Sequence, residues 1–402
     1  MKYGNNILSL IVIATIITIT VKLFNIFTSL LISGSLLILY FMKEKKKQEK
    51  YNKIIKERQI HIENLKKSGL KNLNFQKKIY TKNIATNINI FQGDKIMVSF
   101  LVGKLIFYSI DIMHYQFIEL LCIDELNYNI HNSIELEYGN NLVLVYGNFG
   151  IKIFDIKIKN LKGKEGNKYI IKQKLNMNKF NNEIIKVIEL DKNTLVSISI
   201  DYLLIWYKIK DEYILSKKFL DYNKYENLLI LSNLLKLDNN NIVLLKLANS
   251  NMTKSTIDFI EIINHEPNEI KLLNIDISNS ELGNNNLLLI KQKEKIFLVG
   301  CMKGLAVISG KYMELIQFIS TGEKIKYIEL FFNKYIFFNY KEQNKENEYI
   351  FYQIEFNYDF EKSEKIILKN NSIKEEDLRT IKYFKDGLVI IGDREGYLQL
   401  WH

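Results

Sequence analysis

Residues 85–402 repeat one short β-rich unit, and this repetition constrains the fold more than any other feature of the chain. Each copy has an apolar strand, a polar turn, a strongly apolar second strand, a short turn and an alternating third strand that ends in an aromatic residue. Seven copies align, beginning near residues 87, 135, 187, 234, 287, 326 and 381. One unit of this size does not bury its own faces, so neighbouring copies must pack together.

The copies recur roughly every 40 to 50 residues, the length of a four-stranded propeller blade. The segments GDREGYLQLW at 392–401 and VYGNFGIKIFDI at 145–156 resemble part of WD40 repeats. We therefore predict an all-β fold, a seven-bladed WD40-like β-propeller over residues 76–402. No copy has the Gly-His dipeptide of regular blades, and only Trp206 and Trp401 end a strand as the family's tryptophan does. Packing of Ile, Leu, Phe and Tyr must replace the family's polar network.

The seventh copy stops directly after its third strand, at residues 400–402. An unpaired strand edge is a liability that β proteins avoid. Gln76–Lys82, reading QKKIYTK, is the only unassigned extended segment of suitable length. We predict that it pairs beside Gly396–Trp401 and closes the ring.

Before the repeats, residues 1–42 form an apolar segment that we expect to be a membrane anchor. From Asn6 to Met42 the only charge is Lys22. One helix of this length would measure roughly 55 Å, nearly twice a hydrocarbon core of about 30 Å, so we expect a break.

Two arrangements of the anchor remain open. One is a hairpin of two short helices, Ile7–Val21 and Ile26–Met42, turning at Lys22–Asn25, and the other is a single transmembrane helix near Leu23–Met42. A cleaved signal peptide is a third alternative, which the second apolar run and the lack of a small-x-small cleavage site disfavour.

The net charge of +11 is concentrated near the amino terminus. Residues 1–82 hold 16 Lys and Arg against 4 Asp and Glu, whereas residues 83–402 hold 40 against 41. Because the body of the protein is electrically neutral, nucleic acid is not an expected partner. The excess includes a membrane-proximal basic cluster, Lys43, Lys45, Lys46, Lys47 and Lys50. Such a cluster resists translocation, which predicts that the propeller faces the cytosol, and it can contact anionic lipids.

Residues 43–75 have a helical pattern and predict a basic stalk. Tyr51, Ile55, Ile62 and Leu65 recur near multiples of 3.6 residues among Lys and Glu, and Ser68-Gly69 predicts the end of the helix.

The sequence offers little enzyme chemistry. The five histidines lack metal-ligand spacing, and neither a P-loop nor a G-x-S-x-G motif occurs. Cys122 and Cys301 stand among apolar residues, which predicts inert buried thiols. We therefore expect no catalytic residue, cofactor or metal.

Binding residues are expected on loops that a rigid framework presents. The turns between second and third strands share one face of a propeller, so this face is the candidate partner-binding surface. Its candidate residues are Phe149, Tyr202, Met302, Lys303 and Arg394. Two lengthened loops, Asn249–Thr256 and Lys341–Glu348, fall at the same kind of turn.

The order of anchor first and propeller second resembles the transducin-beta-like proteins of the endoplasmic reticulum membrane. This resemblance implies an integral membrane protein of the reticulum that acts as a non-catalytic scaffold or adaptor for protein partners. The alternative is an exchange-factor-like regulator of a small GTPase in vesicle budding, although the sequence shows no catalytic loop for it.

Overall fold

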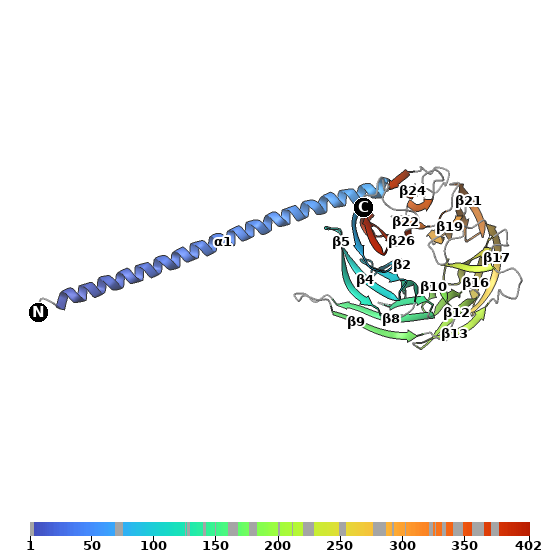
Figure 1. The fold of residues 1–402 in the computed structure, drawn as a ribbon, viewed down its shortest axis with the longest axis horizontal. Coiled ribbons are helices and arrows are strands. Elements are labelled where there is room, and N and C mark those ends of the chain that lie inside the picture. The colour runs from blue at the N-terminus through green and yellow to red at the C-terminus, as the bar shows by residue number, and fades with distance from the viewer. Residues whose placement is uncertain are drawn as a thin grey trace. The chain divides into compact units, whose positions relative to one another are not determined.

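The structure, a computed structural model, has two units, Met1–Lys67 and Ser68–His402, which are described separately (Figure 1). The described residues are 4–68, 75–124, 126, 129–139, 142–148, 150–159, 168–176, 183–199, 202–210, 212–219, 229–248, 255–275, 287–291, 293–301, 303–320, 325, 327–331, 335–340, 349–355, 366–370 and 378–402.

The first unit is one helix, α1 (Gly4–Ser68), which ends where Ser68-Gly69 predicts a stop. It contains a segment that is long and apolar enough to cross a membrane. Lys22–Asn25 are helical, so the structure does not form the turn that the hairpin alternative requires. These residues include neither Gly nor Pro to interrupt the helix.

Polar side chains in the apolar part of α1 are satisfied by the helix itself. The Thr18 hydroxyl donates to the Ala14 carbonyl at 2.8 Å, and the Thr28 hydroxyl donates to the Phe24 carbonyl at 3.0 Å. Such bonds to the preceding turn let Ser and Thr occur in an apolar helix, because they leave no hydroxyl without a partner.

The described strands of the second unit form seven four-stranded antiparallel sheets. We number the sheets by the chain order of their first strands. The first sheet contains β2 (Ala85–Phe91), β3 (Lys95–Phe100), β4 (Lys104–Asp111) and β5 (Gln116–Ile123). The second contains β6 (Ile130–Glu135), β7 (Leu142–Gly147), β8 (Gly150–Lys159) and β9 (Lys168–Asn176). The third contains β10 (Ile184–Asp191), β11 (Thr194–Ser199), β12 (Leu203–Ile209) and β13 (Glu212–Phe219).

The remaining sheets repeat this plan. The fourth contains β14 (Leu229–Lys236), β15 (Asn241–Ala248), β16 (Ser255–Ile263) and β17 (Glu266–Ile275). The fifth contains β18 (Leu287–Lys291), β19 (Ile296–Cys301), β20 (Gly304–Ser309) and β21 (Glu314–Ser320). The sixth contains β22 (Ile328–Phe331), β23 (Tyr335–Tyr340), β24 (Tyr349–Glu355) and β25 (Ile366–Asn370). The seventh contains β26 (Leu378–Tyr383), β27 (Val389–Asp393), β28 (Tyr397–Trp401) and β1 (Phe75–Tyr80), with a 3-10 turn at Lys385–Gly387.

The first strands of the sheets contact one another in the order β2, β6, β10, β14, β18, β22, β26 and again β2. Apolar cores lie between neighbouring sheets. For example, Phe91 and Phe107 of the first sheet share a cluster with Val143 and Phe154 of the second. Such clusters join each neighbouring pair from the seventh sheet through the first to the fifth, as the repeat pattern predicts.

The fourth strand of the seventh sheet comes from the other end of this unit. β1 pairs antiparallel with β28, Ile79 opposite Leu398 and Tyr80 opposite Tyr397. The strand covers residues 75–80, within two residues of the expected bounds 76–82. Ile79 packs against a core that joins the first and seventh sheets, and the Thr81 N–H donates to the Gly396 carbonyl at 2.8 Å. Gly392 permits this close packing, because a Cβ there would stand 2.8 Å from the Ala85 Cβ.

The two tryptophans occupy equivalent buried positions in different polar settings. Trp206 pairs with Leu195, and its indole N–H donates to the Ser197 hydroxyl at 2.8 Å. Trp401 pairs with Val389, so the residue equivalent to Ser197 is Ile391. The indole N–H of Trp401 has no hydrogen-bond partner in the part of the chain that the structure describes.

This difference predicts that replacing each tryptophan by phenylalanine lowers the free energy of unfolding by different amounts. Trp206→Phe should destabilise the protein more than Trp401→Phe, by roughly 1 to 2 kcal/mol, because only the first leaves a buried hydroxyl without its partner. Thermal melting followed by circular dichroism checks the order, with Ser197→Ala as the control that removes the same bond. Equal losses from the two substitutions would contradict this interpretation.

Candidate functional site

The turns between the second and third strands lie at one edge of each sheet and define what we call the second-turn face. Tyr202, Lys303 and Arg394 lie in three of these turns. Lys303 and Arg394 are exposed, whereas Tyr202 is half-buried against the core of the second and third sheets. The Tyr202 N–H donates to the Ser199 hydroxyl at 3.1 Å, which fixes this turn. Phe149 and Met302 lie outside the described residues.

Of the two lengthened loops, residues 341–348 and 249–254 lie outside the described residues. Ser255 and Thr256, which the sequence assigned to the loop Asn249–Thr256, instead begin strand β16 and are buried. Two residues further on, buried Asp258 forms an ion pair with buried Lys246. Burial lowers the pKa of Lys246 to about 8. This end of the fourth sheet is therefore held by a buried ion pair.

Leu101 and Val102 belong to the second-turn face but were missed by the sequence reasoning. They form the turn between β3 and β4, and Val102 is 57% exposed. The Leu101 N–H donates to the Ile84 carbonyl at 3.0 Å, so the turn is anchored. The sequence signal for this exposed turn was a pair of adjacent apolar residues followed by Gly103. They add two exposed apolar residues to the candidates that the sequence predicted for this face.

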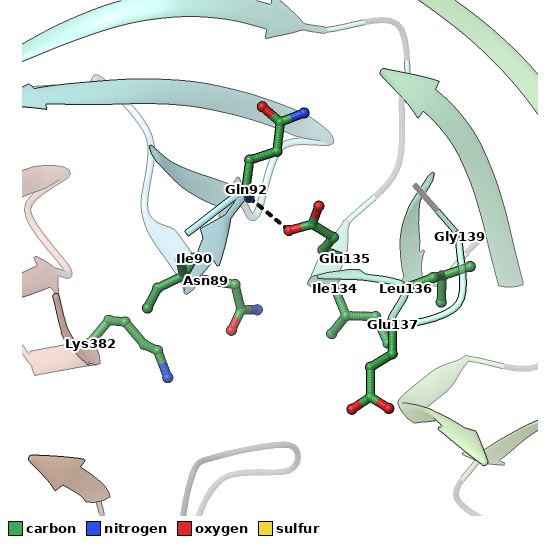
Figure 2. Close-up of a pocket in the computed structure, with 9 residues that line it drawn as sticks. All are labelled: Asn89, Ile90, Gln92, Ile134, Glu135, Leu136, Glu137, Gly139 and Lys382. Atoms are coloured by element: carbon green, nitrogen blue, oxygen red, sulfur yellow. Dashed lines mark hydrogen bonds between the residues drawn. The ribbon is translucent and has the colours of Figure 1, made fainter. Parts of the chain in front are cut away.

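A pocket of about 800 Å³ opens at the opposite edge of the sheets, which carries the turns between first and second strands (Figure 2). We call this edge the first-turn face. The pocket is lined by residues of the first, second and seventh sheets, among them Asn89, Glu135, Glu137 and Lys382. Figure 2 shows Asn89 and Lys382 toward one side and the two glutamates toward the other. The lining combines these polar side chains with the apolar Ile90, Ile134 and Leu136.

Glutamates at the end of first strands link neighbouring sheets around this face. The tripeptide Ile-Glu-Leu occurs at the ends of three first strands, at 134–136, 188–190 and 328–330, and also within the outer strand β5, at 118–120. Glu135 accepts the Gln92 N–H of the first sheet at 2.7 Å, and Glu189 accepts the N–H groups of Glu137 and Tyr138 of the second sheet. Glu329 forms an ion pair with Lys382 of the seventh sheet at 2.5 Å.

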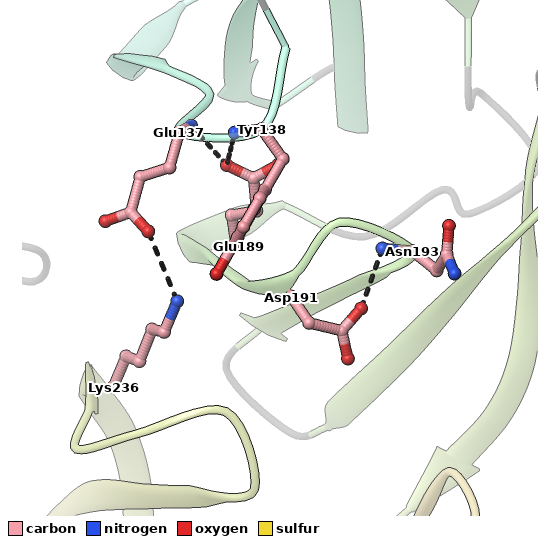
Figure 3. Close-up of polar contacts among 6 residues, drawn as sticks. All are labelled: Glu137, Tyr138, Glu189, Asp191, Asn193 and Lys236. Carbon is pink, nitrogen blue, oxygen red and sulfur yellow. Dashed lines mark hydrogen bonds and ion pairs between the residues drawn. The ribbon is translucent and has the colours of Figure 1, made fainter.

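The fourth sheet has a lysine where these sheets have glutamate. Lys236 extends to Glu137 of the second sheet at 3.3 Å, beside the carboxylate of Glu189 (Figure 3). The contact joins sheets that are not neighbours along the order of first strands. The polar network therefore holds several sheets in fixed positions around the pocket.

Glu189 is the most perturbed carboxyl of this network. It is 7% exposed, and burial raises its pKa to about 7, although the N–H groups of Glu137 and Tyr138 favour the charged form. Lys186, on the same strand, has its pKa lowered to about 8 by burial and by the charge of Lys382. The residues that the structure describes contain no group of three or more His, Cys, Asp or Glu able to hold a metal ion.

The basic cluster of Lys43, Lys45, Lys46, Lys47 and Lys50 lies on α1, and all five side chains are exposed. Lys47 approaches Glu44 at 4.0 Å, a solvent-exposed pair of little energetic weight. The cluster is therefore accessible to a charged surface.

Comparison with known proteins identifies the fold. No protein-family model matches the chain, and no curated protein is found to be a relative. Among solved structures, the chain is similar to the WD40 β-propeller domain of Doa1, with a TM-score of 0.53 and 10% sequence identity. The match covers 83% of this chain and 97% of that chain. The fold is thus WD40-like, and the similarity carries no information on partners.

The raised pKa of Glu189 predicts a pH-dependent stability. The folded protein holds this proton more tightly than the unfolded chain, so stability should fall as pH rises from about 4.5 to about 7 and then stay at its lower level. Glu189→Gln removes the charge and keeps an oxygen acceptor. The variant should be more stable than the wild type at pH 8, on the order of 2 kcal/mol, and nearly equal to it at pH 5.

Melting followed by tryptophan fluorescence at both pH values measures this difference. Glu212→Gln is the matched control, because Glu212 is an exposed glutamate that lies outside this network. If the difference between Glu189→Gln and the wild type does not change with pH, the assignment to Glu189 is wrong.

Proposed function

We propose that this protein is a membrane-anchored, non-catalytic scaffold whose propeller holds a protein partner on the second-turn face. The proposal rests on the set of turns that lie at one edge of a WD40-like fold. This fold generally serves protein interaction, and binding residues are usually found on loops that a rigid framework presents. Leu101 and Val102 supply an apolar contact, and Lys303 and Arg394 supply exposed positive charge. Arginine is enriched among the residues that carry most of the binding energy of protein interfaces.

We further propose that the propeller has seven blades and is closed by β1. The seven sheets formed by the described strands, the cyclic contacts of their first strands and the pairing of β1 with β28 support this. A closed ring suits a scaffold, since it presents its turns in fixed positions without a free sheet edge at the junction.

The anchor is proposed to be α1, in the membrane of the endoplasmic reticulum, with the propeller in the cytosol. The length and apolar character of α1 support the anchor, and the lysines that follow its apolar part support the orientation. Those lysines would also attract anionic lipids, at about 1 kcal/mol per residue near the surface.

Affinity purification of the detergent-solubilised full-length protein tests the scaffold. Lys303→Glu combined with Arg394→Glu should abolish recovery of the main partner, because the exposed positive charges of two described turns of the face are reversed. Lys192→Glu, at an exposed turn of the first-turn face, is the matched control. A partner retained by the double variant would place the binding surface elsewhere, and a small GTPase bound only without nucleotide would favour the alternative regulator.

The orientation of the protein in the membrane is tested with sealed microsomes that contain it. Protease added to sealed microsomes should digest the propeller, because it faces the cytosol in this account. Full protection that is lost on adding detergent would contradict the cytosolic orientation.

A further inference from the structure

The outer strand of the fifth sheet, β21, exposes an unusual amount of apolar surface. Leu315, Ile316 and Phe318 are 43%, 42% and 44% exposed, and Tyr312, in the turn before the strand, is 64% exposed. A contiguous apolar patch on a soluble domain marks an interaction surface more often than isolated exposed residues do.

The patch continues onto the fourth sheet. Ile270 and Leu272 of β17 are each 43% exposed, and Ile270 lines a small crevice together with Met313 and Lys311 beside the start of β21. We call these six exposed residues the rim patch: Ile270, Leu272, Tyr312, Leu315, Ile316 and Phe318.

β21 also lacks the residues that usually protect an outer strand. The outer strands β1, β9, β13, β17 and β25 each contain lysine, and β5 has a glutamate, Glu119, in its middle. The only charged residue of β21 is Glu314, at its first position. Lysine and other charges on edge strands discourage association, so their absence leaves this edge open to another chain.

The surface beside Tyr312 suits a second copy of the same chain. A hollow of about 430 Å³ is bordered by Tyr312 itself, by Ile316 and by two lysines and two glutamates, namely Lys293, Lys311, Glu294 and Glu314. A two-fold axis would bring the projecting Tyr312 of each copy to the hollow of the other, and equal numbers of positive and negative charges would allow each Lys to meet a Glu.

The available area agrees with a reversible dimer. With about 200 Å² for a large side chain, the rim patches of two copies would bury roughly 1,100 Å² of apolar surface, close to the lower limit of about 1,000 to 1,200 Å² for a specific interface. We propose that the rim patch packs against the rim patch of a second copy around a two-fold axis and makes the protein a weak homodimer. This proposal is independent of the partner-binding function of the second-turn face.

Light scattering of the full-length protein in detergent, over a range of concentrations, tests the proposal. The molar mass of the wild-type protein should rise from that of a monomer to that of a dimer as the concentration rises. Phe318→Lys and Leu315→Lys should each weaken the dimer on the order of tenfold or more, because each places a charge within the apolar interface. Ile118→Lys is the matched control, since Ile118 is 47% exposed on β5, the outer strand of the first sheet.

Circular dichroism should show that all variants have the melting temperature of the wild type. A variant that no longer dimerises is then still folded. A wild type that stays at one copy at every concentration would overturn the proposal. A dimer that persists unchanged in Phe318→Lys and Leu315→Lys would also overturn it, because the contact would then lie elsewhere in the chain. A dimer that Ile118→Lys weakens equally would show that any outer-strand lysine acts alike and would contradict the specific surface.

Discussion

In the ring that we propose, the rest of the propeller depends on the pairing of β1 with β28. Residues 378–401 supply three strands of the seventh sheet, and residues 75–80 supply the fourth. This pairing covers the edge of β28, and Ile79 completes a core that the first and seventh sheets share. Because this pairing joins residues more than 300 positions apart, it costs chain entropy. The strand pairing and the shared core together have to offset this cost.

Contacts between sheets explain how the fold persists with little of the polar network of WD40 repeats. Trp206 keeps one indole-to-hydroxyl bond, whereas Trp401 has Ile391 at the equivalent position. The sheets are instead joined by apolar cores and by the glutamates of the Ile-Glu-Leu tripeptides, whose carboxylates bind N–H groups or lysines of adjacent sheets. The carboxylate links lie around the pocket of the first-turn face.

The sequence predicts the WD40-like β fold because strand alternation and a repeat of roughly 40 to 50 residues can be recognised along the chain without knowledge of tertiary contacts. It also predicts an end of α1 at Ser68. It does not predict that α1 continues through Lys22–Asn25, since the expected break came from membrane thickness rather than from those residues. The pocket and the exposed Leu101 and Val102 depend on which sheets meet and how far side chains are covered, and these are tertiary properties. Phe149 and Met302 stay predictions.

Closure by β1 is tested most directly by comparing two internal deletions in the full-length protein, followed by tryptophan fluorescence on heating. Both tryptophans lie in the second unit, so the signal reports on the propeller alone. Removing residues 43–70 should leave the melting temperature within about 2 °C of the wild type, whereas removing residues 43–82 should lower it by roughly 10 °C or more, because a paired strand and its core contact are lost. Equal melting of the two proteins would show that β1 does not hold the ring closed.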